Sequence, residues 1–176
     1  MSTTEEALGR DLVATAVLRG DFLLRSGARS SYYIDKYLFT TQPSLLRRIA
    51  VSLSALMPAG VQRLAGPVLG AVPLVTALSL ETGLPMVIVR TDKPKEYGTA
   101  RQIEGGELQP AERVLLVEDV VTTGGAALSA VDELRAAGAD VIGALVVVDR
   151  EQGGPEAFAA RGVPFRALFT KSGLGL

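Results

Sequence analysis

The sequence predicts an α/β protein in which helices flank a parallel β-sheet, with a small helix-and-hairpin unit at the N-terminus. From residue 63 onward, apolar runs of strand length alternate with helix-length segments, a pattern typical of βαβ units. The strand runs, such as VIGALVVV at residues 141–148, are apolar throughout, as strands are when helices cover both faces of a sheet. The 176 residues suit a single domain spanning 1–176.

The first 40 or so residues, called the hood below, should form a helix followed by a hairpin. A helix is expected over residues 4–19, where acidic residues near the start complete a capping box. The segment DFLLRSGARSSYYID, residues 21–35, contains two short strand-like runs around a Ser-Gly turn and predicts a hairpin. Another helix should follow over residues 43–57, because proline suits a first helical turn.

The elements expected after the hood alternate regularly between strand and helix. The strands are predicted at 63–68, 85–90, 113–119, 141–149 and 164–169, and the helices at 69–83, 124–138 and 156–161. Residues 91–106 form the one long connection without a pattern of its own. Such connections are usually functional lids or disordered segments, so we expect a mobile lid there.

Composition narrows the chemistry that the protein can perform. The chain contains no cysteine and no histidine, which excludes a thiol nucleophile, a Ser-His-Asp triad and a zinc site with imidazole ligands. A net charge of -1 gives no reason to expect nucleic acid as a partner. The N-terminus does not resemble a secretory signal, and no apolar run is long enough to span a membrane. These features predict a soluble, cytoplasmic protein.

The stretch VLLVEDVVTTGG places two acids between a buried strand and a glycine-rich turn. Glu118 and Asp119 follow the apolar residues 114–117, at the strand end where open α/β sheets bind ligands. Residues 122–125 then lead into a helix, and backbone amides at such a turn can hold a phosphate. The acids would repel that phosphate, so they should face sugar hydroxyls or Mg²⁺. A ribose 5-phosphate meets both demands; the alternative is a solvated acid pair beside an ordinary helix cap.

This stretch resembles the phosphoribosyl pyrophosphate (PRPP) signature of type I phosphoribosyltransferases. The shared order is an apolar run, two acids, two apolar residues, a threonine, a variable residue and two glycines. The resemblance implies that PRPP is bound by Glu118, Asp119, Val120, Val121, Thr122, Thr123, Gly124, Gly125 and Ala126. The signature does not identify the base that accepts the sugar.

Three further stretches resemble the orotate phosphoribosyltransferase family, in the family's order. They are LLRSGARSSYYIDKYLF at 23–39, KPKEYGTARQIEG at 93–105 and VVVDREQGG at 146–154. The resemblance implies transfer of the phosphoribosyl group from PRPP to orotate, which yields orotidine 5-phosphate and pyrophosphate in pyrimidine biosynthesis. It also implies Mg²⁺ as cofactor, held mainly by PRPP and water with no residue directly assigned to it, and a homodimer in which each lid closes over the neighbouring site.

The resemblance assigns residues to the base pocket. Arg150 matches the orotate-contacting arginine, and a guanidinium can grip a planar carboxylate through two parallel hydrogen bonds. Tyr33 and Ile34 match positions that line this pocket, and Thr122 is also expected to contact orotate. From the residues alone, Arg150 could instead pair with Glu151 or lie in solvent, and the Tyr-Ile pair could belong to the hairpin core.

The resemblance also assigns the residues that act on PRPP. Lys95 matches the lid lysine that stabilises the departing pyrophosphate, and it is expected to share the catalysis with Glu118 and Asp119. The other PRPP-binding residues implied by the resemblance are Arg25, Arg90, Lys93 and Tyr97.

The chain departs from the family pattern at several of these positions. Thr91 and Asp92 stand where adjacent basic residues are common, Leu69 replaces a frequent lysine, and Arg25 replaces a lysine. These departures keep two alternatives open. One is a phosphoribosyltransferase for another base, such as a purine; the other is a non-catalytic regulator that senses PRPP or nucleotides.

Overall fold

A six-stranded sheet forms the centre of the computed structural model, which describes residues 3–23, 29–91 and 101–176. The strands lie in the order β5-β4-β3-β6-β7-β8. Their bounds are β3 Arg63–Pro67, β4 Met86–Val89, β5 Ile103–Glu104, β6 Arg113–Val121, β7 Asp140–Asp149 and β8 Phe165–Thr170. All pairs are parallel except β4–β5 at one edge, which is antiparallel. The predicted fold class is confirmed.

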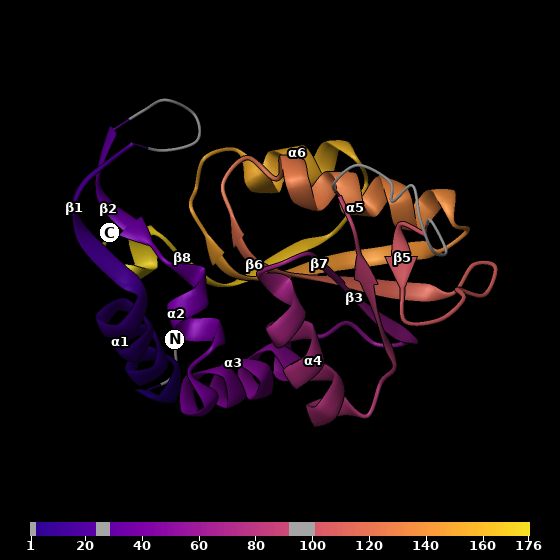
Figure 1. Cartoon of the computed structure of the whole chain (residues 1–176), viewed down its shortest axis with the longest axis horizontal. Coiled ribbons are helices and arrows are strands. Elements are labelled where there is room, and N and C mark those ends of the chain that lie inside the picture. Colours follow the sequence, from indigo (N-terminus) through magenta and orange to yellow (C-terminus); the bar gives the residue numbers. More distant parts are fainter. Residues whose placement is uncertain (1–2, 24–28, 92–100) are drawn as a thin grey trace.

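Helices cover both faces of this sheet. Figure 1 shows α3 (Pro43–Leu56) and α4 (Ala71–Thr82) on one face, and α5 (Gly125–Ala136) and α6 (Gly154–Ala160) on the other. A short 3₁₀ helix, η1 (Ser172–Leu174), follows the last strand. None of the described helices combines the length and apolar character required to cross a membrane.

The core has two layers because side chains alternate along the strands. Leu115 and Val117 of β6 pack with the hood, α3 and α4, whereas Val114 and Leu116 pack with α5. Strand β7 divides its side chains in the same way between the two layers. Since successive strand residues point to opposite faces, a strand covered on both sides must be apolar at every position. This burial explains the unbroken apolar runs in the sequence.

The hood comprises α1 (Thr3–Ala16), β1 (Val17–Leu23), β2 (Arg29–Ile34) and α2 (Lys36–Thr40). The expected first helix ends three residues early, at Ala16 rather than at residue 19. The residues from Val17 to Arg19 instead pair with β2 as an antiparallel strand. The β-branched Val17 favours a strand, and ladder bonds to β2 are available only once the hairpin has formed. Tertiary pairing therefore set this boundary, which local helix propensity placed wrongly.

Besides η1, the structure adds two elements that were not predicted. Helix α2 begins after Asp35, whose side chain accepts a hydrogen bond from the Tyr37 amide at 3.0 Å, as an N-cap residue does. Phe39 of α2 is fully buried in the core, which fixes α2 against the main domain. Strand β5 lies within the expected patternless segment 91–106 and pairs with β4. Residues 92–100 of that segment lie outside the described part of the chain.

The sheet order places a topological switch point between β3 and β6. The chain leaves β3 through α4 toward β4 on one side, and leaves β6 through α5 toward β7 on the other. The two connections therefore diverge at the carboxyl ends of neighbouring strands. Open α/β sheets bind their ligands at such a switch point, so the site should lie there.

Candidate active site

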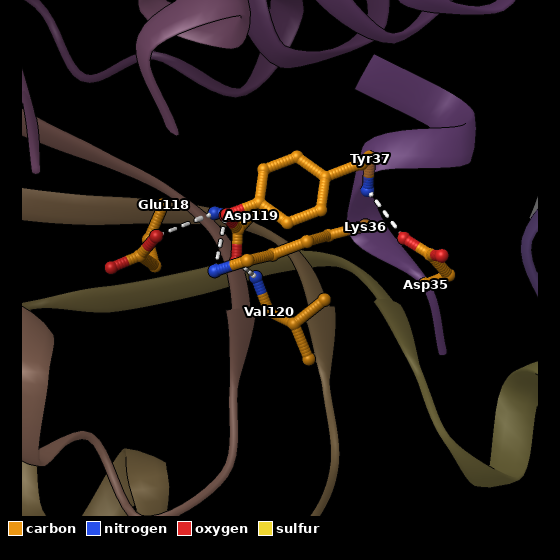
Figure 2. Close-up of polar contacts among 6 residues, drawn as sticks. All are labelled: Asp35, Lys36, Tyr37, Glu118, Asp119 and Val120. Atoms are coloured by element: carbon orange, nitrogen blue, oxygen red, sulfur yellow. Dashed lines mark hydrogen bonds and ion pairs between the residues drawn. The ribbon is translucent and has the colours of Figure 1, made fainter. Parts of the chain in front are cut away.

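The acid pair is buried at the carboxyl end of β6. Glu118 is 7% exposed and Asp119 only 1%. The backbone amide of Asp119 donates to Glu118 Oε1 at 3.0 Å, and the amide of Val120 donates to Asp119 Oδ1 at 2.6 Å (Figure 2). Burial and these backbone bonds hold both carboxylates in place. The alternative of a solvated acid pair is therefore wrong.

A lysine from the hood reaches the buried aspartate. Lys36 Nζ lies 3.1 Å from Asp119 Oδ2 and donates a hydrogen bond to Oδ1 at 3.4 Å (Figure 2). Asp119 Oδ2 is buried and makes no hydrogen bond to any described residue, so it can still accept one. Gly70 lies beside this pair, and a Cβ placed there would collide with Oδ2 and lie 2.8 Å from Nζ. The lack of a side chain at Gly70 makes room for the ion pair.

The acids resist carrying two negative charges in the absence of a ligand. Burial, and next the charge of Asp119, raise the pKa of Glu118 to about 8. Burial also raises the pKa of Asp119, although the charge of Lys36 opposes that rise. At neutral pH one proton is therefore retained on the ligand-free pair. Groups that donate hydrogen bonds or bring positive charge would favour its release.

The raised pKa of Glu118 predicts that the ligand-free protein loses stability as pH rises. The folded state holds a proton on Glu118 up to about pH 8, whereas the unfolded chain releases it near pH 4.5. This contribution is fully present below pH 4.5 and is lost as pH rises through about 8. Urea unfolding at several pH values should show the decline, and Glu118→Gln should reduce it. Equal slopes for the variant and the wild type would contradict the assignment.

The glycine turn after β6 leads directly into α5. Gly124 is the N-cap residue and adopts φ 84°, a left-handed conformation that a side chain would strain. The side chain of Phe158 lies behind it, 3.3 Å from the position of an added Cβ. Thr123 and Gly125 are exposed, and the first amides of α5 have no partner within the helix. This turn can accept an anion through backbone amides and the positive end of α5.

Arg150, the residue expected to bind the base, directly follows β7. Its amide donates to Val121 O at 2.8 Å, which fixes the residue beside the glycine turn. The guanidinium carbon lies 5.7 Å from the ring centroid of Tyr32, within the range of a cation–π contact. Arg150 Nε is buried and has no hydrogen-bond partner among the described residues. Glu151 instead binds Ser172, so the alternative of an Arg150–Glu151 salt bridge is wrong.

The structure separates the two residues that were expected to line the base pocket. Tyr33 is 41% exposed, and its ring packs against that of Phe22 in a tilted arrangement, with centroids 5.8 Å apart. Ile34 is buried in the core layer beneath the hood, on the same face of β2 as Tyr32. Strand alternation therefore turns Tyr32, rather than Tyr33, toward Arg150. The contacts of Tyr33, Ile34 and Thr122 with orotate remain predictions.

The remaining expected PRPP-binding residues fall into three groups. Val120 and Val121 pack into the two core layers, so only their backbone can face a ligand. Arg90 follows β4 at the carboxyl edge of the sheet, and its amide donates to Gln102 O at 2.7 Å. The last group lies outside the described residues: Arg25, Lys93, Lys95 and Tyr97.

Two residues of the site, Lys36 and Tyr32, had no role in the sequence prediction. Each is brought to the site by a contact distant in sequence. The capping residue Asp35 and the strand period of two were signals that could have placed Lys36 and Tyr32. The contact between Gly70 and Asp119 had no local signal.

Glu118 and Asp119 suit a metal ion that takes most of its ligands from substrate and water. No group of three or more metal-binding side chains gathers within the described ranges. Glu118 and Asp119 are hard oxygen donors, but two carboxylates supply fewer ligands than Mg²⁺ takes. The remaining ligands would come from substrate phosphates, substrate hydroxyls and water.

Comparison with known proteins agrees with this geometry. The phosphoribosyl transferase domain family matches residues 43–159, more than half of the chain. The chain is 48% identical to the orotate phosphoribosyltransferase of Halobacterium salinarum, covering 99% of this chain and 98% of the relative. It is 50% identical to the Pyrococcus furiosus orotate phosphoribosyltransferase, over 90% and 87% of the two chains.

A solved structure shows the same fold with a ligand. The Mycobacterium tuberculosis orotate phosphoribosyltransferase in complex with PRPP superposes with a TM-score of 0.84 at 31% identity, covering 98% of this chain and 99% of that one. The likeness extends over the hood as well as the sheet. The chain therefore belongs to the phosphoribosyl transferase family and, within it, to the orotate phosphoribosyltransferases, which are pentosyltransferase enzymes.

Proposed function

We propose that this chain transfers the 5-phosphoribosyl group of PRPP to orotate, giving orotidine 5-phosphate and pyrophosphate. One observation carries the proposal. A buried acid pair, a glycine turn at a helix start and an arginine with an unused donor meet at the switch point of the sheet. These three groups suit a sugar diol, a phosphate and an anionic base respectively.

The acid pair binds the ribose of PRPP in this proposal. The 2- and 3-hydroxyls donate hydrogen bonds to Glu118 and Asp119, and Asp119 Oδ2, which pairs with Lys36 but accepts no hydrogen bond from any described residue, accepts one of them. The 5-phosphate lies in the turn formed by residues 122–126, where the positive end of α5 and the backbone amides receive it. The ribose therefore lies between the acid pair and the glycine turn.

Orotate lies beside Arg150 in this proposal. The buried Nε and the terminal nitrogens of the guanidinium donate to the orotate carboxylate. Tyr32 packs against the guanidinium and limits its rotation. Tyr33, Ile34 and Thr122 complete the base pocket. A purine base carries no carboxylate and would leave the Arg150 charge unpaired, so this residue favours orotate.

Transfer breaks the bond between C1 of ribose and the pyrophosphate oxygen, and the electron pair leaves with pyrophosphate. A ring nitrogen of orotate forms the new bond to C1 and releases its proton to water. Positive charge grows on the ribose ring and negative charge on the leaving group. The chain's own cations stabilise that negative charge most strongly in the transition state: Lys95, with Lys93, Arg90 and Arg25. When bound with PRPP, Mg²⁺ adds positive charge at the same place.

The proposal also includes the lid and the oligomeric state of the protein. The lid, expected within residues 91–106, closes over the site while β5 stays paired with β4. Tyr97 contacts PRPP, and Lys95 reaches the pyrophosphate. We propose that the protein is a homodimer in the cytoplasm, with each lid serving the neighbouring site. Large exposed apolar side chains in the hood support a contact surface there: Leu18, Leu23, Tyr33, Tyr37 and Leu38.

A panel of bases tests the proposed reaction. The protein is incubated with PRPP, Mg²⁺ and one base at a time: orotate, uracil, adenine, hypoxanthine or xanthine. We expect pyrophosphate release only with orotate. Release with a purine instead would assign another base, and binding of PRPP without release under any condition would identify a non-catalytic sensor.

The variant Arg150→Met tests whether Arg150 binds orotate. Loss of the guanidinium should raise KM for orotate by about ten- to a hundredfold, the effect expected for a hydrogen bond to a charged group. The affinity for PRPP should change little, because the acid pair and the glycine turn remain. An unchanged KM for orotate would remove Arg150 from the base pocket.

A further inference from the structure

Lys36, the first residue of α2, brings a positive charge to the carboxyl end of the sheet from the hood. Its ammonium group pairs with Asp119, whose side chain is 2% exposed, while the lysine side chain itself is 34% exposed. The Lys36 side chain therefore packs against the buried acid while about a third of its surface remains exposed. A cation in this position can contact a ligand without moving its helix.

The ammonium lies beside both Asp119 and the turn that follows β3. Lys36 Cε and Nζ are 2.7 Å and 2.8 Å from the Cβ position of Gly70, the N-cap residue of α4 (Figure 2 shows Lys36 extending to Asp119). Val68 and Leu69 of that turn are apolar, and Leu69 is 66% exposed. The turn thus supplies backbone and the positive end of α4 but no cation. Lys36 provides the positive side chain that contacts it.

The stereochemistry of PRPP directs its leaving group to this place. In PRPP the pyrophosphate at C1 and the 2- and 3-hydroxyls project from the same face of the ribose ring. The inference rests on the proposed function, in which those hydroxyls bind Glu118 and Asp119. Pyrophosphate must then extend from C1 alongside Asp119. The ammonium of Lys36 and the positive end of α4 lie on one flank of that acid.

We propose that Lys36 binds the pyrophosphate group of PRPP and stabilises its departure. When the ribose hydroxyls replace the ammonium at Asp119, the ammonium turns to the neighbouring phosphate oxygens. As the C1–O bond breaks and its electron pair leaves with pyrophosphate, the attraction to Lys36 strengthens, which lowers the barrier. This assigns a catalytic cation to the hood, in addition to the lysines expected in the lid.

The binding of two ligands that are each a part of PRPP distinguishes pyrophosphate binding by Lys36 from a role in positioning Asp119. Inorganic pyrophosphate with Mg²⁺ and ribose 5-phosphate are titrated separately, by calorimetry, into wild type and Lys36→Met. We expect the variant to bind pyrophosphate about ten- to a hundredfold more weakly, the effect of one lost hydrogen bond to a charged group. Ribose 5-phosphate affinity should change by less than about threefold, since that ligand lacks the group that Lys36 contacts. The turnover number should fall as well.

Arg48→Met is a matched control, because it also removes one cation of the hood-side surface, where Arg48 pairs with Asp11. It should bind both ligands like the wild type. Lys36→Arg keeps the positive charge and should retain most of the pyrophosphate affinity. It replaces Lys36→Met in the test if the methionine variant unfolds.

Two outcomes would overturn the inference. Equal losses for both ligands in Lys36→Met would limit Lys36 to positioning Asp119, and unchanged pyrophosphate affinity would remove it from the site. A wild-type protein that binds neither PRPP nor pyrophosphate would instead refute the proposed function itself, together with this inference.

Discussion

Asp119→Asn is expected to lower the turnover number by at least about 100-fold, the loss typical of one preorganised electrostatic contact. Asparagine keeps the shape of the side chain but removes its charge. The ribose would then lose a charged acceptor at the point where positive charge develops on the ring. The lost charge would also leave Lys36 without its carboxylate partner. Steady-state kinetics with saturating PRPP and orotate measure the effect.

Asp132→Asn is the matched control for this prediction. Asp132 pairs with Arg161 at the surface of α5, and both side chains are about half exposed. Exposed pairs of this kind contribute little to stability, and this one lies outside the site, so turnover should stay near the wild-type value. Near wild-type turnover of Asp119→Asn would remove the acid pair from the mechanism.

Gly70→Ala is expected to reduce kcat/KM by about 100-fold or more through steric displacement of the ion pair. The backbone of Gly70 has φ -67°, which any residue adopts, so alanine introduces no backbone strain. Its Cβ, however, would collide with Asp119 Oδ2 and crowd the ammonium of Lys36. One of these groups must move from the place where it meets the substrate.

Gly20→Ala provides the comparison for Gly70→Ala. Its added Cβ would meet only the side chain of Phe22, at 3.2 Å, on an exposed strand of the hood. Activity should be retained there. If Gly70→Ala keeps full activity and its crystal structure shows Asp119 unmoved, the close approach of Gly70 and Asp119 is wrong.

The acid pair and the glycine turn could be predicted from the sequence because they are close together along the chain. Glu118, Asp119 and the glycine turn lie within eight consecutive residues, and strand, turn and helix follow one another directly. The physical demands of a buried strand end and a helix start therefore act on one continuous stretch. The alternation of strands and helices predicted the fold class for the same reason.

The hood side of the site could not be predicted in this way. Lys36 and Asp119 are separated by 83 positions, and only the docking of α2 through Phe39 brings them together. Tyr32 and Tyr33 differ only in the face of β2 that each occupies. That face depends on the register of the hairpin, which pairs Arg19 with Tyr32. The same pairing moved the end of α1 from residue 19 to Ala16.

A crystal structure of the protein with PRPP and Mg²⁺ tests the central claim most directly. We expect the ribose 2- and 3-hydroxyls within hydrogen-bond distance of Glu118 and Asp119, and the 5-phosphate against the amides of residues 122–126. A structure with that turn empty and the sugar bound elsewhere on the protein would contradict the account.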